Sequence, residues 1–190
     1  IDSGAMYRAI TLKAINLGID LEDERKYKFV KDTDFRFLNG TLYMDGIDVS
    51  HDIRENDVSN NVSLVSSFLS VRKELVLAQQ VLADNHNVVM DGRDIGYKVL
   101  PNAKYKFYLT ASIKKRAERR NIDNIKRNIK SDLEIIEKEI ERRDFLDTTR
   151  KYSPLKAADD AVIIDTSDLA IDQVVKLITD KIMEDEKNGF

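Results

Sequence analysis

The chain has 190 residues, of which 42% are hydrophobic and 34% are charged, and its formal net charge is −3. This is the composition of a globular protein long enough to bury a core, and it excludes wholesale disorder and collagen-like repetition. Cysteine is absent, which excludes disulfide bonds, cysteine-based metal centres and a thiol nucleophile, and the two histidines, His51 and His86, are too few and too far apart to suggest a histidine metal cluster.

The first half of the chain predicts helices that flank a small β insert. Ser3 is a suitable N-cap, apolar residues follow it at helical spacing, and Gly18 ends this helix. Residues 34–49 alternate in polarity around Asn-Gly and Asp-Gly turn signals, which predicts a short antiparallel insert. Apolar residues then recur at helical spacing over 64–82, which predicts one long amphipathic helix.

The second half alternates short apolar runs with helical patterns. Residues 88–90 and 161–164 are apolar runs that end at an aspartate, and each predicts a short buried strand. The patterns also predict a strand at 104–109 and helices at 112–127, 131–146 and 171–182. Strands that alternate with helices indicate an α/β fold with a mostly parallel sheet covered on both faces.

Charge and hydropathy bear on location and partners. No apolar run approaches the ~18 residues that a membrane span needs, and no secretory signal is visible, so we expect a cytosolic protein. The slightly acidic net charge argues against binding to RNA or DNA, although a cluster of arginines keeps that alternative open.

Ligands of α/β sheets bind beyond the carboxyl ends of the strands, and the first such position is the segment Asp2-Ser3-Gly4-Ala5-Met6-Tyr7-Arg8. Ser3 opens a helix, whose free N–H groups and positive dipole end attract anions. Because Tyr7 and Arg8 follow one turn later, the segment could hold an anionic ligand that contains a ring. The same pattern also fits an N-cap followed by a surface Tyr–Arg pair.

The second such position is Asp91-Gly92-Arg93-Asp94. A carboxylate at a strand end suits the ligand shell of Mg²⁺, and Arg93 could clamp a phosphate through two hydrogen bonds. Asp94 could accept a hydrogen bond from an exocyclic amine or orient Arg93. A turn with a surface Asp–Arg pair is the alternative.

Arginine is concentrated towards the C-terminal half, at Arg116, Arg119, Arg120, Arg127, Arg142, Arg143 and Arg150. The first three share one face of a predicted helix, and arginine favours planar recognition of phosphate. Acidic residues are interspersed, so an ordinary charged helix pair is the alternative. Neither a G-x-x-x-x-G-K-[ST] loop nor a G-x-G-x-x-G motif occurs in the sequence.

Taken in order, these segments resemble the bacterial cytidylate kinases, a family of nucleoside monophosphate kinases. The resemblance covers essentially all 190 residues. It rests on the Asp2 to Arg8 segment, Asn56-Asp57-Val58, Ser63, Val71-Arg72, Asp91-Gly92-Arg93-Asp94-Ile95-Gly96, Arg116-Ala117-Glu118-Arg119-Arg120, Arg143-Asp144, Asp147, Arg150, Ser153-Pro154-Leu155 and Ala158-Asp159-Asp160-Ala161.

The resemblance implies a P-loop kinase-like parallel sheet with helices on both faces. It further implies a core domain over residues 1–18 and 86–190 with a helical lid at about 112–150, and a monophosphate-binding region over 19–85 that includes the β insert at about 34–49. Family members carry a strand, a glycine-rich P-loop and a helix before the Asp-Ser-Gly-Ala motif, and this chain starts at that motif. We therefore expect the chain by itself to recognise CMP but not to catalyse transfer.

The resemblance also implies roles for individual residues. It assigns the cytosine edge to Ser63, Arg72 and Asp94, the sugar to Tyr7, Arg143 and Asp147, and the CMP phosphate to Ser3, Arg8, Arg93 and Arg150. It assigns a catalytic part to Arg150 and to three lid arginines that close over ATP, Arg116, Arg119 and Arg120, and an outer-shell contact with Mg²⁺ to Asp91.

The implied reaction is ATP + CMP (or dCMP) to ADP + CDP (or dCDP), a step of pyrimidine nucleotide metabolism, carried out in the cytoplasm by a monomer without nucleic-acid or membrane partners. Phosphoryl transfer depends on positioning and charge stabilisation, which accounts for many arginines and no nucleophile. Two alternatives stay open: a non-catalytic nucleotide-binding module that lacks a P-loop, and a kinase for another nucleoside monophosphate such as AMP or UMP.

Overall fold

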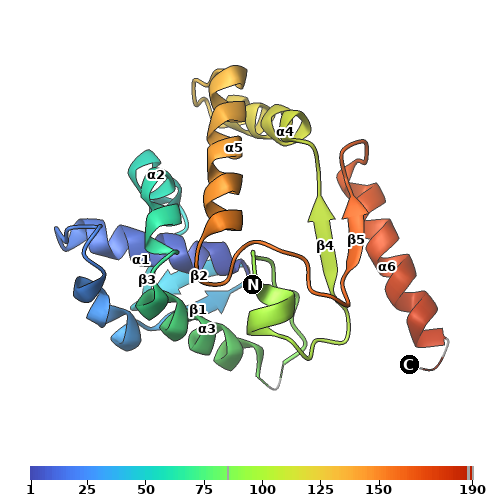
Figure 1. Cartoon of the computed structure of the whole chain (residues 1–190), viewed down its shortest axis with the longest axis horizontal. Helices are drawn as coiled ribbons and strands as arrows, with labels where there is room; N and C mark the ends of the chain where they lie inside the picture. The colour runs from blue at the N-terminus through green and yellow to red at the C-terminus, as the bar shows by residue number, and fades with distance from the viewer. Residues whose placement is uncertain (85, 188, 190) are drawn as a thin grey trace. The chain divides into compact units, whose positions relative to one another are not determined.

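The computed structural model describes residues 1–84, 86–187 and 189. The chain forms two compact units, the first built from Ile1–Pro101 with Leu146–Lys156 and the second from Asn102–Phe145 with Ala157–Phe190 (Figure 1). The division into core, lid and monophosphate-binding region that the family resemblance implies remains a prediction.

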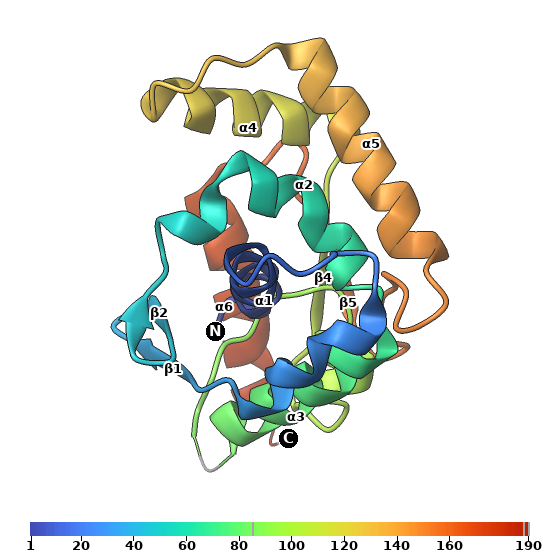
Figure 2. The same ribbon diagram turned by 90° about the vertical axis from the view of Figure 1, so that its left-hand side faces the viewer.

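Helix α1 (Ser3–Asn16) is the centre of the first unit. Its side chains Met6, Ala9 and Ile10 are completely buried. Helices α2 (Asn56–Val65) and α3 (Leu69–Ala83) pack against it, and Figure 2 views α1 along its axis with α2 and α3 on opposite sides. A sequence that places small and apolar residues all around α1 therefore makes it a core helix.

The two ends of α1 differ in how well the sequence predicts them. The C-terminal end is as expected, because Gly18 adopts a φ of 63° directly after the helix. The N-cap is Asp2 and not Ser3: Asp2 has an extended backbone, and its Oδ1 accepts a hydrogen bond from the N–H of Ala5 at 2.8 Å. Ser3 is the first helical residue instead.

The long helix expected over 64–82 is interrupted, since α2 ends at Val65 and α3 begins at Leu69. The hydroxyls of Ser66 and Ser67 donate to the carbonyls of Ser63 and Leu64, at 3.1 and 2.6 Å. Such local hydrogen bonds compete with the helical ladder, and two successive serines end the helix here.

The β insert is confirmed as a three-stranded antiparallel sheet of β1 (Phe35–Leu38), β2 (Thr41–Met44) and β3 (Ile47–Asp48). Both of its turns have two successive residues at positive φ, which is the geometry of tight hairpin turns and explains the Asn-Gly and Asp-Gly pairs. Phe35, Leu42 and Met44 bury their side chains in the core of this unit. Short 3₁₀ helices at Glu24–Asp32 and Asp52–Arg54 flank the insert.

Residues 88–90 do not form the expected buried strand, and Val89 is 90% exposed. Within the described ranges the run pairs only with the start of the chain, through an isolated parallel bridge between Asp2 and Asp91. The N–H of Ser3 donates to the carbonyl of Asp91 at 3.2 Å. A single bridge places these two aspartates side by side but provides too few ladder bonds for a strand. A π-helical turn, Ile95–Val99, follows.

The second unit contains the parallel pair β4 (Phe107–Thr110) and β5 (Val162–Asp165), in the register Phe107 opposite Val162. It also contains α4 (Ile113–Lys126), most of α5 (Leu133–Thr149) and α6 (Ile171–Lys187). The α/β class is therefore confirmed. The prediction that β5 is buried is wrong, because Ile163 is 65% exposed and no helix in the described part of this unit covers that side chain.

Helices α4 and α5 pack against each other through a small apolar cluster of Ala117, Ile136 and Ile140. This contact confirms the predicted helix pair at 112–127 and 131–146. Across the described residues, we find no helix with both the length and the apolar character that a membrane crossing requires.

Candidate functional site

Arg72 and Asp94 form a buried ion pair in the first unit, where they are 3% and 4% exposed. The Nη2 group of Arg72 donates to Oδ2 of Asp94, and its Nη1 donates to the carbonyl of Ser66 at 2.9 Å. A buried ion pair adds little net stability, because desolvation of both charges offsets their attraction. Its presence therefore fits a recognition site better than a structural brace.

The ring of Tyr7 lies beneath this pair, 5.2 Å from the guanidinium carbon of Arg72. Burial raises the pKa of Tyr7 to about 12, with Asp94 raising it further and Arg72 opposing. The phenol is therefore protonated at physiological pH and can donate a hydrogen bond. Its hydroxyl is buried, and no hydrogen-bond partner for it exists among the residues that the structure describes.

A second carboxylate, Asp147 at the end of α5, is contacted by two arginines. Nε of Arg93 donates to its Oδ2 at 2.9 Å, and Nη1 of Arg150 lies 3.6 Å from its Oδ1. Desolvation lowers the pKa of Arg150, and the nearby charge of Arg72 lowers it further. Arg72, Arg93 and Arg150 thus outnumber the two buried aspartates that they contact, Asp94 and Asp147, by one charge, which favours an anionic ligand.

The start of α1 is tied to the Asp91 loop. Oγ of Ser3 donates to the carbonyl of Asp91 at 2.6 Å, and Nη2 of Arg8 donates to Oδ2 of Asp2 at 2.7 Å. A Cβ at Gly92 would lie 2.2 Å from Oγ of Ser3, so only glycine allows this close approach. Desolvation and the neighbouring charge of Asp2 raise the pKa of Asp91.

Most residues that the sequence singles out therefore belong to the first unit. Ser63 lies on α2, half-buried, and its carbonyl accepts from the Ser66 hydroxyl, which connects it to the backbone segment that Arg72 holds. The site residues that this unit brings together are Ser3, Tyr7, Arg8, Ser63, Arg72, Asp91, Arg93, Asp94, Asp147 and Arg150.

The arginines of the expected lid lie in the second unit, where each contacts protein groups. Arg116 forms two hydrogen bonds with the carboxylate of Asp144, at 2.9 and 2.6 Å. Arg120 lies 3.1 Å from the carboxylate of Glu139. Arg119 donates to the carbonyls of Thr166 and Leu169 after β5. Their catalytic role, like the role of Arg143 on α5 in holding the sugar, stays a prediction.

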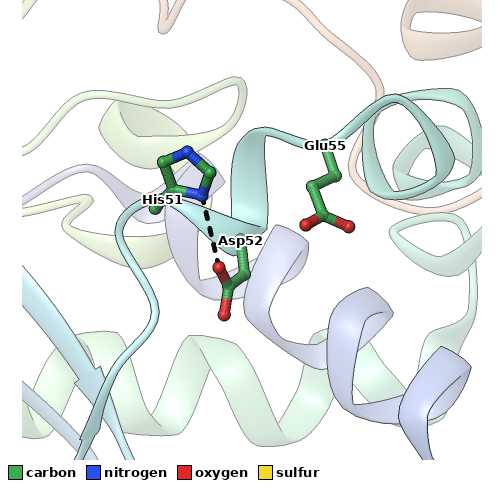
Figure 3. Close-up of side chains that lie close together, drawn as sticks. All are labelled: His51, Asp52 and Glu55. Carbon is green, nitrogen blue, oxygen red and sulfur yellow. Dashed lines mark hydrogen bonds and ion pairs between the residues drawn. The ribbon is translucent and has the colours of Figure 1, made fainter.

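One surface group has the composition of a metal site. His51, Asp52 and Glu55 offer ligand atoms within 4.8 Å of one another, and all three side chains are exposed. Figure 3 shows that the one marked contact, at 3.4 Å, joins His51 to Asp52. Exposed acidic groups commonly gather without an ion, so this cluster does not by itself define a metal site.

Several polar residues that lie beside the predicted site residues are not predicted from the sequence. Gln79 of α3 is 1% exposed, and neither atom of its amide is hydrogen-bonded within the described part of the chain. It follows Arg72 by seven residues, two helical turns, so the two share a face of the helix. That spacing was the available signal. Asp144, which stands in a family motif, and Thr166, which follows the apolar run 161–164, were given no role from the sequence, although they contact Arg116 and Arg119.

An α/β chain in which arginines contact buried carboxylates has what a nucleotide phosphotransferase needs, since such enzymes work by positioning phosphates and neutralising their charge. Comparison with known proteins makes this class specific. The family model for cytidylate kinase matches residues 1–184.

Individual relatives agree with the family match. The chain is 50% identical over 182 residues to a cytidylate kinase from Pediococcus pentosaceus, a match that covers 93% of this chain and 80% of that protein. It is 46% identical to a cytidylate kinase from Acholeplasma laidlawii (96% and 82% covered) and 47% identical to one from a Geobacillus species (97% and 83% covered). The chain belongs to the cytidylate kinase family.

Proposed function

We propose that this protein transfers the γ-phosphate of ATP to CMP or dCMP, and that the buried Arg72–Asp94 pair reads the cytosine base. The observation that carries the proposal is this pair itself, with the guanidinium of Arg72 over the Tyr7 ring, in a chain of the cytidylate kinase family. A desolvated charged pair discriminates strongly between ligands, because a base that fails to complete its hydrogen bonds leaves buried charge unpaired.

The chemistry of cytosine matches the donors and acceptors of these residues. Cytosine presents an exocyclic amine, which a carboxylate accepts from, and a ring nitrogen and carbonyl, which Ser63 and Arg72 can donate to. A carboxylate has about four lone-pair sites, so Asp94 can bind the amine while it keeps Arg72. Uracil presents a carbonyl in place of the amine, and that oxygen would face the negative charge of Asp94.

For the sugar and the phosphate we propose the remaining polar residues. Tyr7, Asp147 and Arg143 would bind the sugar, Tyr7 through its protonated hydroxyl. Arg8, Arg93 and Arg150 would bind the phosphate together with Ser3. The Ser3 hydroxyl already donates to the carbonyl of Asp91, so it would have to exchange that partner for a phosphate oxygen.

The proposal includes Mg²⁺ with ATP. Asp91 and Asp2 lie side by side; burial and the charge of Asp2 raise the pKa of Asp91, and a hard cation nearby would offset both effects. Asp91 would hold the hydrated ion in its outer shell. When bound, Mg²⁺ neutralises charge on the transferring phosphoryl group. Arg116, Arg119, Arg120 and Arg150 are the residues that we propose for stabilising the transition state.

We further propose that the protein acts in the cytosol as a monomer, with nucleotides as its partners rather than nucleic acid. A chain without cysteine fits a reducing compartment, since its stability cannot depend on disulfides. A kinase for AMP or UMP and a non-catalytic nucleotide-binding module are the competing functions.

Calorimetric titration of the chain with CMP, dCMP, UMP and AMP tests the monophosphate half of the proposal. We expect CMP and dCMP to bind at least about tenfold more tightly than UMP and AMP, the effect of roughly one discriminating hydrogen bond to a charged group. Preference for AMP or UMP would favour the competing kinases. Absence of monophosphate binding by the folded chain would contradict the site.

A further inference from the structure

Gln79 is a polar side chain in an apolar position. It lies on the core-facing side of α3, 1% exposed, and neither its Oε1 nor its Nε2 has a hydrogen-bond partner among the described residues. A buried amide without partners destabilises a folded protein, because it loses water and gains nothing in return. A residue that only filled this space would be better replaced by methionine or leucine.

The neighbour of Gln79 is in the same state. The hydroxyl of Tyr7 on α1 is also buried and also unpaired within the described part of the chain. The Gln79 amide lies close enough to the phenol to lower its pKa slightly against the larger effect of burial, yet no atom pair of the two groups has hydrogen-bond geometry. Two complementary groups thus face each other without forming their bond.

Tyr7 in turn touches the residues that we propose to read the base. Its ring lies 5.2 Å from the guanidinium of Arg72, which is bonded to Asp94. Gln79, Tyr7, Arg72 and Asp94 therefore form a continuous buried row that runs from α3 to α1, back to α3 and on to the loop before Ile95. All four belong to the first unit.

We propose that Gln79 is a positioning residue of the nucleotide site: its amide holds the Tyr7 hydroxyl when the nucleotide is bound, and the Tyr7 ring then fixes the guanidinium of Arg72. This inference rests on the proposed function. The amide N–H of Gln79 donates to the phenol oxygen, which leaves the phenol O–H to donate to the ligand. Hydrogen bonds in such sites are often long in the free protein and tighten in the complex.

A substitution at Gln79 should affect the stability of the free protein and its affinity for CMP differently. In the free protein the Gln79 amide is unpaired, so replacing it with an apolar side chain of similar length removes a destabilising group. In the complex the same replacement removes a hydrogen bond. Gln79→Met should therefore leave the melting temperature unchanged or raise it, while it weakens CMP binding. A residue with only a structural role would show the opposite pattern.

The experiment measures the Kd for CMP and the melting temperature of the wild-type chain, Gln79→Met, Tyr7→Phe and the double variant. We expect the Kd to rise about threefold to tenfold in Gln79→Met, the effect of roughly one hydrogen bond, and at least as much in Tyr7→Phe, which also removes the hydrogen bond from the phenol to the ligand. Both changes break the contact between Gln79 and Tyr7. The double variant should therefore have a Kd for CMP no higher than that of the single variant with the higher Kd.

Gln80→Met is the matched control. Gln80 is the next residue of α3, it is exposed, and its Nε2 donates to the carbonyl of Val99 at 3.0 Å. Its replacement should lower the melting temperature slightly and leave the Kd for CMP unchanged.

Two results would overturn the proposal: an unchanged Kd in Gln79→Met, or Kd effects of Gln79→Met and Tyr7→Phe that multiply in the double variant. If Gln79→Met fails to fold, Tyr7→Phe decides, because it keeps the ring and removes only the hydroxyl, and wild-type affinity in that variant contradicts the proposal. Failure of the wild-type chain itself to prefer CMP would instead contradict the proposed function.

Discussion

A few individual residues define the proposed nucleotide site. Sequence motifs predict some of these residues, and only the structure reveals the others. Arg72 and Asp94 stand in segments that resemble the cytidylate kinases, and the structure pairs them in the core. The sequence does not predict the Asp2 cap or the buried Gln79 amide, because a capping role and a buried amide depend on backbone geometry and on tertiary neighbours. The spacing of Gln79 from Arg72 places both on one face of α3 but does not show that the Gln79 amide is buried without a partner.

The close approach of Gly92 to Ser3 predicts that a larger residue at position 92 destabilises the protein. A Cβ at Gly92 would lie 2.2 Å from Oγ of Ser3, so Gly92→Ala must displace Ser3 or separate Asp91 from Asp2. We expect a loss of about 1–3 kcal/mol in the free energy of unfolding, the usual effect of overpacking, together with weaker CMP binding. Denaturant unfolding and calorimetry measure both.

Gly4→Ala is the control for that change. Its added Cβ would lie 3.1 Å from Oδ1 of Asp2 and 3.2 Å from Nη1 of Arg8, contacts that a small shift relieves, whereas all three nearest atoms at Gly92 lie within 2.9 Å. A Gly92→Ala variant no less stable than Gly4→Ala would show that the close approach at Gly92 is unimportant.

At the scale of elements, periodicity located most helices but not their boundaries. The helix expected over 64–82 breaks where Ser66 and Ser67 bond their own backbone. The run 88–90 has the composition of a buried strand but forms no ladder among the described residues, since strand formation depends on partners that composition does not specify. Turn chemistry was the most reliable signal, and both hairpin turns of the insert lie where the glycines predict.

The packing of α4 against α5 gives the element-scale prediction. Arg116 contacts Asp144 through two hydrogen bonds, whereas Arg120 reaches Glu139 at a single, more exposed contact. Lysine cannot reproduce a planar two-point contact. Arg116→Lys should therefore lower the free energy of unfolding by about 0.5–1 kcal/mol. Arg120→Lys should leave it almost unchanged, as expected for a partly exposed ion pair.

Hydrogen exchange of the α4 and α5 amides measures this difference. Faster exchange in Arg116→Lys than in Arg120→Lys is the expected result. Equal exchange in the two variants would mean that the two-point contact does not hold these helices together.

At the scale of the whole molecule, the α/β class followed from the alternation of strand and helix patterns, and the family followed from motifs in the right order. The expectation of strands buried on both faces did not hold, as the exposure of Ile163 on β5 shows. An apolar run indicates that a strand can be covered, but only the tertiary structure decides whether it is.

Alkaline stability is a whole-molecule property with a defined sign. Burial raises the pKa of Tyr7 to about 12 from a usual value of 10.0, so the folded state favours the protonated phenol. Above pH 10 the unfolded chain releases this proton first, and stability falls until about pH 12. The difference between the folded and unfolded pKa corresponds to at most about 3 kcal/mol in the free energy of unfolding.

Tyr7→Phe removes this titration and should flatten the loss of stability between pH 10 and pH 12. Melting temperatures measured from pH 8 to pH 12 test it. Identical pH profiles for the two chains would show that Tyr7 is not the buried phenol described above.

Base recognition by the Arg72–Asp94 pair is tested by the ratio of the UMP Kd to the CMP Kd in the wild-type chain and in Asp94→Asn, each shown to be folded by its melting transition. An asparagine amide can donate to the uracil carbonyl that a carboxylate repels. We predict that the ratio, at least about tenfold in the wild type, falls to about one or below in Asp94→Asn. An unchanged ratio in the folded variant would contradict the claim that the buried Arg72–Asp94 pair reads the base.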